Sequence, residues 1–77
     1  MPESRPPFEQ NAHRRAFGDR VSGLRREQGW TQEQLAEHAQ LHRSYVAGLE
    51  SGARNPTLDV IVKLADALQV RPSRLLR

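Results

Sequence analysis

The chain has 77 residues, of which 36% are hydrophobic, which is enough for one small domain and excludes a second one. It contains no cysteine, so disulfides and thiolate metal sites are excluded, and its longest aliphatic run, Val60-Ile61-Val62, excludes a membrane-spanning helix. Twelve basic and nine acidic residues give a formal net charge of +3, which is compatible with a nucleic-acid partner but does not by itself indicate one.

The N-terminal region divides into an arm and the start of a domain. Residues 1–12 hold three of the five prolines and show no helical or strand periodicity, so we expect a flexible arm there. The domain is then expected over residues 13–77. Its first helix is predicted over residues 13–28, ending at Gly29, from apolar residues at intervals of four and three: Phe17, Val21 and Leu24.

The second helix has the strongest local start signal. Thr31-x-x-Gln34 is a capping box, in which the threonine hydroxyl accepts from the backbone amide of Gln34 and the Gln34 side chain accepts from that of Thr31. Trp30 before the cap and Leu35 at the fourth helical position are the pair that packs together as a hydrophobic staple. These signals predict a helix over residues 32–39.

Three further segments follow at short intervals. Apolar residues at helical spacing predict a third helix over residues 43–51, ended by Gly52. Thr57 caps a fourth helix over residues 58–69, and a proline then opens a short fifth segment over residues 73–76. Since no strand pattern is present, the sequence predicts an all-α fold of five helices.

The second and third helices, joined by a three-residue turn, form a helix-turn-helix over about residues 32–51. This part of the chain closely resembles the Cro/CI-type, or XRE, family of repressor domains, and the resemblance covers about residues 17–76. The residues that carry it are Thr31-Gln32-Glu33-Gln34-Leu35-Ala36, Arg43-Ser44-Tyr45-Val46, Leu49-Glu50-x-Gly52 and Arg54-Asn55-Pro56-Thr57-Leu58. The resemblance implies a lambda-repressor-like domain that acts as a sequence-specific DNA-binding transcriptional regulator and not as an enzyme.

In that family the second helix of the motif lies in the major groove, with its first residues toward the base edges. The resemblance therefore implies a base-reading set of Arg43, Ser44, Ala47 and Gly48. Arg43 can donate two hydrogen bonds to one guanine, worth about 1–3 kcal/mol of discrimination, and Ala47 can contact a thymine methyl. A solvated arginine at a helix start is the alternative, but the helix dipole disfavours a cation there, which favours the functional interpretation.

A second set of residues is expected at the DNA backbone. Gln32, the first residue of the second helix, resembles the phosphate-contacting glutamine of the family, although a generic polar first-turn residue is the alternative. Arg54 and Asn55, before the fourth helix, look like further phosphate contacts. His42 is expected beside DNA at the start of the third helix, and the hydroxyl of Tyr45 can reach a phosphate while its ring is half-buried.

Two further positions concern the stability of the motif. Arg25 and Glu50 look like the internal ion pair of the family, which we interpret as structural. The turn between the two helices of the motif usually carries glycine, where this chain has Gln40. A left-handed glutamine costs about 1 kcal/mol or more, so either this cost is tolerated or the turn differs.

The fourth helix carries more apolar surface than one small core requires. At 100° per residue its apolar positions spread over about 220°, whereas a stripe facing one core needs little more than about 100°. The surplus predicts a C2 homodimer on a palindromic operator with half-sites about 34 Å apart. The alternative is that the surplus only closes the core. The predicted interface residues are Val60, Leu64, Ala67, Val70, Leu75 and Leu76.

The sequence also offers weaker candidates for a site and for a function. His38 and His42 have the spacing of a metal pair, but the predicted helix ends between them and no third ligand follows, so neither a metal nor another cofactor is expected. We expect no small-molecule effector and no membrane partner, and a cytoplasmic location. Within the regulators, restriction–modification controller proteins are a candidate subtype. The rivals are an antitoxin that binds a toxin protein, and a general nucleic-acid binder using the arginines of the first helix.

Overall fold

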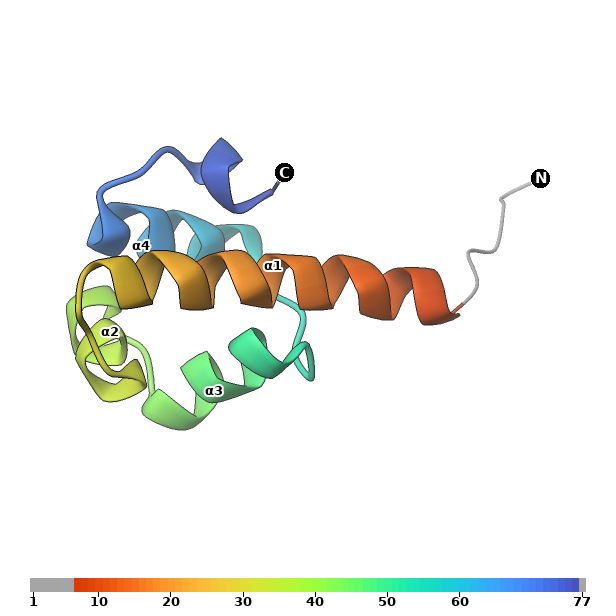
Figure 1. The fold of residues 1–77 in the computed structure, drawn as a ribbon, viewed down its shortest axis with the longest axis horizontal. Coiled ribbons are helices and arrows are strands. Elements are labelled where there is room, and N and C mark those ends of the chain that lie inside the picture. The colour runs from red at the N-terminus through yellow and green to blue at the C-terminus, as the bar shows by residue number, and fades with distance from the viewer. Residues whose placement is uncertain (1–6, 77) are drawn as a thin grey trace.

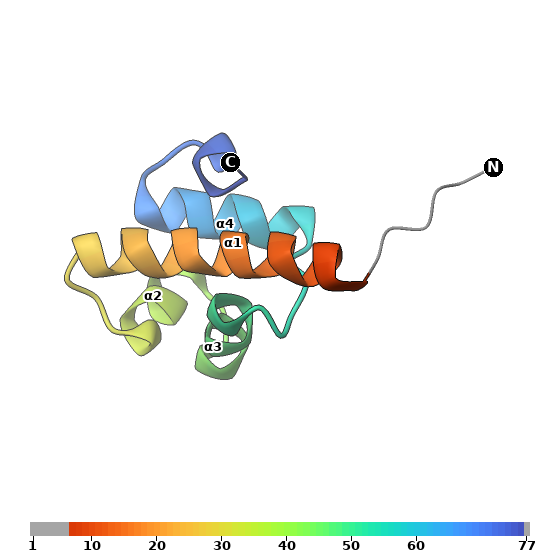
Figure 2. The same ribbon diagram turned by 45° about the vertical axis from the view of Figure 1, so that its right-hand side comes forward.

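The computed structural model describes residues 7–76, and side chains from residue 12 onward, as four α-helices and one 310 turn (Figure 1). The long α1 crosses the middle of the molecule, with α2 and α3 on one side and α4 on the other (Figure 2). No strand occurs in this described part, in agreement with the all-α prediction. The bounds are α1 Pro7–Glu27, α2 Gln32–Ala39, α3 Arg43–Ser51, α4 Leu58–Leu68 and the 310 turn η1 Pro72–Leu75.

Every element contributes to one hydrophobic core. Complete burial of a leucine or valine side chain stabilises a fold by about 1.5–3 kcal/mol, so a few such residues account for much of the stability of a small domain. Because the core lies between α1 and the other four elements, it fixes the position of α3 relative to α1. The largest fully buried side chains are Val21 of α1, Leu35 of α2, Val46 and Leu49 of α3, Leu64 and Leu68 of α4, and Leu75 of η1.

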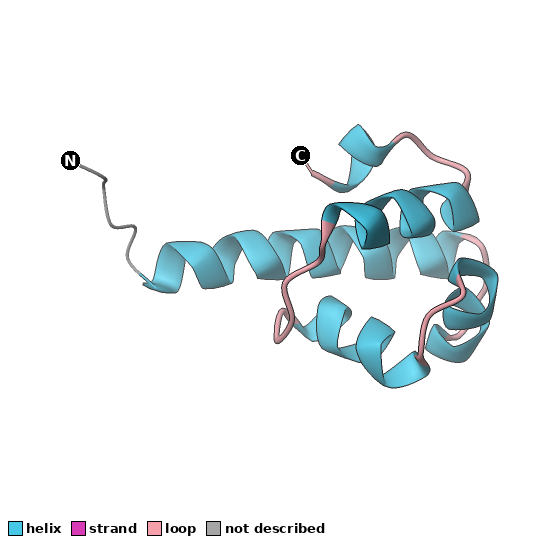
Figure 3. Cartoon of the chain, turned by 180° about the vertical axis from the view of Figure 1, so that it is seen from behind, coloured by secondary structure: helices cyan, strands magenta, loops and turns pink. Residues whose placement is uncertain are grey.

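The start of α1 differs from the prediction. We expected an arm over residues 1–12 and a helix from residue 13, but α1 begins at Pro7, so the boundary is wrong. Proline suits the first turn of a helix, because its φ is already helical and the N–H that it lacks would be unpaired there. The N-terminal end of α1 projects beyond the other helices (Figure 3). Residues 1–6, the remainder of the predicted arm, lie outside the described residues.

The fifth predicted helix is also corrected. The segment expected over residues 73–76 is a 310 turn, Pro72–Leu75, so the described chain has four α-helices and not five. A segment of four residues is too short for a series of α-helical hydrogen bonds, and tighter turns are usual in pieces of this length. The turn nevertheless belongs to the core, because Leu75 is fully buried.

The turn between α2 and α3 keeps its left-handed residue without glycine. Gln40 has φ 57° and ψ 45°, and its backbone N–H donates to the carbonyls of Ala36 and Glu37. Gln69 ends α4 in the same conformation, with φ 59° and ψ 43°. The cost expected at Gln40 is therefore tolerated, and the turn geometry of the resembled family is retained.

The crossing of α1 over α3 depends on a glycine. A Cβ atom at Gly18 would collide with the backbone carbonyls of Leu49 and Glu50 at the C-terminal end of α3. The absence of a side chain at this position lets the two helices approach closely. The close approach brings Arg25, further along α1, within reach of Glu50.

Candidate nucleic-acid interface

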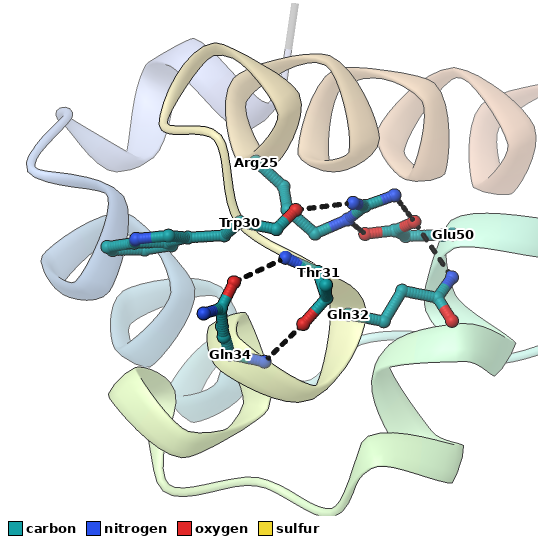
Figure 4. Close-up of polar contacts among 6 residues, drawn as sticks. All are labelled: Arg25, Trp30, Thr31, Gln32, Gln34 and Glu50. Atoms are coloured by element: carbon teal, nitrogen blue, oxygen red, sulfur yellow. Dashed lines mark hydrogen bonds and ion pairs between the residues drawn. The ribbon is translucent and has the colours of Figure 1, made fainter.

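The start of α2 is closed by its own side chains. The backbone amide of Gln34 donates to Thr31 Oγ1 at 3.1 Å, and the backbone amide of Thr31 donates to Gln34 Oε1 at 2.8 Å (Figure 4). Both bonds of the predicted capping box are therefore present. They satisfy two amides that a helix start otherwise leaves without a partner in the helix.

Arg25 and Glu50 form the expected ion pair, between α1 and α3. Arg25 Nε lies 2.7 Å from Glu50 Oε2, and Arg25 Nη2 donates to Glu50 Oε1 at 3.0 Å. Arg25 Nη1 donates to the carbonyl of Trp30 at 2.7 Å, which ties the segment before α2 to the same guanidinium (Figure 4). The two side chains are only 11% and 6% exposed.

This geometry has two electrostatic consequences. The hydrogen bond to Glu50 raises the pKa of the Arg25 guanidinium above its ordinary value, against the opposite effect of burial. In turn the guanidinium neutralises the Glu50 carboxylate, which otherwise would repel a nearby phosphate. Breaking such a buried pair strands one charge, so the pair holds α1, α2 and α3 in one arrangement.

Gln32 joins the same network. Its Nε2 donates to Glu50 Oε1 at 3.0 Å, an internal bond that the sequence did not indicate. The amide carries a second N–H, so the predicted phosphate contact remains chemically available to it. The bond fixes the direction of the side chain at the start of α2, which is also where backbone amides favour an anion.

The outward face of α3 carries the predicted base-reading residues. At 100° per residue, this face lies opposite the buried Val46 and Leu49. On this face Arg43 and Ser44 are exposed, whereas Ala47 and Gly48 are half-buried.

The start of α3 is open, unlike that of α2. His42 occupies the N-cap position and is exposed, but its side chain makes no capping hydrogen bond. The first turn of α3 contains no acidic residue. Its backbone amides and Arg43 therefore present positive potential outward, at the end of the helix where the macrodipole is already positive.

The predicted phosphate contacts after α3 lie beside it. The Arg54 guanidinium carbon lies 5.5 Å from the centre of the Tyr45 ring, a cation–π arrangement. Tyr45 is half-buried, as expected, whereas Arg54 and Asn55 are exposed. Arg54 thus projects next to the outward face of α3, on the same side of the molecule as the base-reading set.

Two contacts near the interface were missed from the sequence. The rings of Trp30 and His38 stack with centroids 4.1 Å apart and planes 7° from parallel. The stem of exposed Arg15, on α1, lies against Gly52 at the end of α3, which places another cation beside the motif. The cluster of arginines in α1 was the available signal for Arg15, but its direction depends on the crossing of the two helices.

The predicted dimer surface is partly wrong. Leu64 and Leu75 are fully buried in the core, so they are unavailable to a second subunit. The apolar arc of α4 is wide because α1, α2 and η1 all pack around it. Val60, Ala67 and Val70 are half-buried against the core. Among the side chains that the structure describes, the exposed large hydrophobic ones are Leu58 at 73%, Val62 at 40% and Leu76 at 61%, and of these only Leu76 was predicted.

The described residues contain neither a metal-binding cluster nor a membrane-spanning helix. No group of three or more His, Asp or Glu side chains there is arranged to hold a metal ion. No helix among them is both long and apolar enough to span a lipid bilayer.

Comparison of the sequence with known proteins places the chain in a family. Residues 23–75 match the helix-turn-helix family HTH_3. The control protein C.BamHI of Bacillus amyloliquefaciens is 42% identical over 67 residues, which cover 86% of this chain and 83% of that protein. The immunity repressor protein of Bacillus phage phi105 is 41% identical over 58 residues, which cover 75% of this chain but 40% of the repressor.

A solved structure of another controller protein is also similar to this chain. The crystal structure of the restriction-modification controller protein C.AhdI from Aeromonas hydrophila has a TM-score of 0.81 and 47% sequence identity, over 83% of this chain and 97% of that chain. The family match covers more than half of the chain and includes all of α2, α3 and α4. The chain therefore belongs to the helix-turn-helix, or XRE, family of DNA-binding transcriptional regulators.

Proposed function

We propose that the protein is a homodimeric regulator that binds a palindromic operator and acts as a restriction–modification controller in the cytoplasm. The observation that carries the proposal is the open, basic start of α3, with Arg43 and Ser44 exposed on a helix that the Arg25–Glu50 pair holds in place. The controller subtype is supported by similarity along most of the length of C.BamHI and C.AhdI. The phi105 repressor, by contrast, is matched over less than half of its length.

The proposed binding mode divides the work between two groups. Arg43 and Ser44 enter the major groove and read base edges, with Ala47 against a thymine methyl. The side chains of Gln32, His42, Tyr45, Arg54 and Asn55 contact phosphates on either side. Phosphate contacts fix the register of α3 on the duplex and are independent of sequence, whereas Arg43 supplies the discrimination.

The proposed dimer uses the exposed apolar side chains of α4 and the segment after it. Leu58, Val62 and Leu76 are large hydrophobic side chains in contact with water, an arrangement that a second copy of the chain would relieve. Val60, Ala67 and Val70, which are half-buried, extend this surface. Two copies related by a two-fold axis would present two α3 helices to successive major grooves, about 34 Å apart.

Selection from a pool of random DNA duplexes tests the function. We expect an enriched palindrome with two half-sites about one helical turn apart, and sedimentation of the protein with the selected duplex as two chains per duplex. Binding without any enriched sequence would contradict the regulator proposal and favour a general nucleic-acid binder. A single chain per duplex at tens of micromolar protein would contradict the dimer.

A further inference from the structure

The outward face of α3 contains a notch at Gly48, and the side chain of Arg54 fills it. A Cβ atom built at Gly48 would lie 2.7 Å from Arg54 Cγ, 3.4 Å from Nε and 3.5 Å from Cδ. The first distance is shorter than any real side chain permits. The arginine stem therefore occupies the space that any other residue at position 48 would fill.

Two further contacts hold Arg54 in this position. The guanidinium lies over the ring of Tyr45, one turn before Gly48, at 5.5 Å from the ring centre. The backbone amide of Arg54 donates to the carbonyl of Gly48 at 3.2 Å, and that of Ala53 donates to the same carbonyl at 2.9 Å. The backbone of Arg54 is thus tied to α3, its stem lies across the glycine, and its charged end lies over the aromatic ring.

We propose that Gly48 is the positioning residue for Arg54 and that it acts by leaving this notch, so that the Arg54 guanidinium is held ready for a DNA phosphate. This inference rests on the proposed function, because it concerns the same interface. It replaces the expectation that Gly48 faces a base edge. A glycine has no side chain with which to read a base, but its missing side chain determines where a neighbouring arginine lies.

The physical gain is preorganisation. A free arginine has many rotamers, and fixing it at an interface costs conformational entropy at the moment of binding. Arg54 has lost part of that freedom before DNA arrives, since the notch and the Tyr45 ring confine its stem and its charged end. With a side chain at position 48, the stem has to leave the notch, and the ordering cost returns to the binding step.

The substitution Gly48→Ala separates this role from a role in folding, because it is expected to weaken binding without destabilising the fold. Alanine is the better helix former, which offsets the packing that the displaced Arg54 stem loses against α3 and Tyr45, so the melting temperature is expected to change by less than about 4 °C. Its affinity for the selected duplex is expected to fall about tenfold, because one arginine side chain in each subunit must then be ordered at the binding step. The matched control is Gly23→Ala in α1, where a Cβ meets nothing within 4 Å, and which should raise the melting temperature without changing affinity.

A double-mutant cycle with Arg54→Ala identifies the partner. Arg54→Ala alone is expected to weaken binding to all sequences and to lower the salt dependence by about two phosphate contacts per duplex, one from each subunit of the proposed dimer. In that background, Gly48→Ala should cause no further loss. An equal loss from Gly48→Ala with and without Arg54 would overturn the proposal, since position 48 would then act on DNA directly. Unchanged affinity of Gly48→Ala in the wild-type background would overturn it as well.

Two additions keep this test apart from the test of the proposed function. Each affinity is measured on the selected duplex and on a scrambled duplex, because a phosphate contact contributes to both. If selection enriches no sequence, the regulator proposal fails, while the loss for Gly48→Ala on the scrambled duplex still reports on Arg54. Nuclear Overhauser contacts between Arg54 methylenes and Tyr45, the single tyrosine, should be present in the free wild type and lost in Gly48→Ala. Their persistence in the variant would overturn the proposal without any DNA.

Discussion

The N-terminal ends of α2 and α3 differ in how their backbone amides and side chains are hydrogen-bonded. At α2, Thr31 and Gln34 exchange two hydrogen bonds, and Gln32 donates to the carboxylate of Glu50. At α3, His42 occupies the N-cap position but its side chain makes no capping hydrogen bond, and the exposed Arg43 follows it. The first helix start is satisfied within the protein, and the second is presented to solvent.

This difference teaches how a small domain divides stability from recognition. Helix-start amides need acceptors, and an internal acceptor stabilises the fold whether or not a ligand is present. An open start forgoes that stabilisation, but it keeps its amides and its positive potential available for an anion. In the proposed binding mode, the closed start of α2 therefore contributes mainly to the scaffold, and the open start of α3 contributes the base-reading surface. Substitutions on the two sides should separate these roles.

The largest expected effect is a loss of stability when the Arg25–Glu50 ion pair is broken. Glu50→Ala leaves the buried guanidinium of Arg25 without its partner, so we expect the free energy of unfolding to fall by about 3–5 kcal/mol. Urea denaturation followed by circular dichroism measures it. The control is Glu37→Ala, an exposed glutamate of α2, which should change stability by no more than about 0.5 kcal/mol. A loss below about 1 kcal/mol for Glu50→Ala would show that the pair is not structural.

The next largest effect is expected for Arg43 at the open start of α3, where a substitution should change DNA binding but not stability. Arg43→Ala is expected to lose about 1–3 kcal/mol per half-site of preference for the selected over the scrambled duplex, while stability changes by less than about 0.5 kcal/mol. Competition anisotropy on the two duplexes measures this preference. Lys63→Ala, which removes one positive charge from an exposed position of α4, is the matched control and should leave the preference unchanged. An equal effect of both variants would mean that Arg43 contributes only charge.

A smaller effect compares the two caps directly. Thr31→Ala removes a capping bond and should lower the free energy of unfolding by about 1 kcal/mol. His42→Ala removes a cap residue that makes no such bond, and should change stability by no more than about 0.5 kcal/mol. Urea denaturation of the pair under identical conditions provides the measurement. If His42→Ala destabilised the protein as much as Thr31→Ala, the start of α3 would not be open.

The smallest effect concerns the end of α2. Gln40→Gly should stabilise the protein by up to about 1 kcal/mol, because glycine adopts the left-handed conformation of Gln40 without a steric cost. Gln28→Gly is the control, since Gln28 has no positive φ and should gain nothing. Thermal denaturation compares the two variants. A gain at Gln28 equal to that at Gln40 would contradict the conformational explanation.

The helix bounds were predictable where capping is local. Thr31, Thr57 and Gly52 signal the ends of their helices through neighbours within a few residues, and α2 and α3 match the predicted ranges. The start of α1 was missed because apolar periodicity begins at Phe17, whereas the helix already begins at Pro7, where no apolar spacing marks it. Periodicity reports burial, so it marks only the part of a helix whose apolar side chains recur on one face.

The site was predictable to the extent that one helix determines it. The outward face of α3 follows from its period of 3.6 residues, and the Arg25–Glu50 pair followed from the family resemblance. The burial of Leu64 and the place of Arg54 across Gly48 depend on which other segment covers a face. A helical period gives the direction of a side chain but not its neighbour, so these features required the tertiary structure.

The most direct test of the division between the closed and open helix starts is to repeat the duplex selection with the Arg43→Ala variant. We predict that the palindrome loses its preference at one guanine position in each half-site and keeps the other positions, because the fold and the phosphate contacts remain. An enriched sequence identical to that of the wild type would contradict the assignment of the start of α3 as the surface that reads the operator.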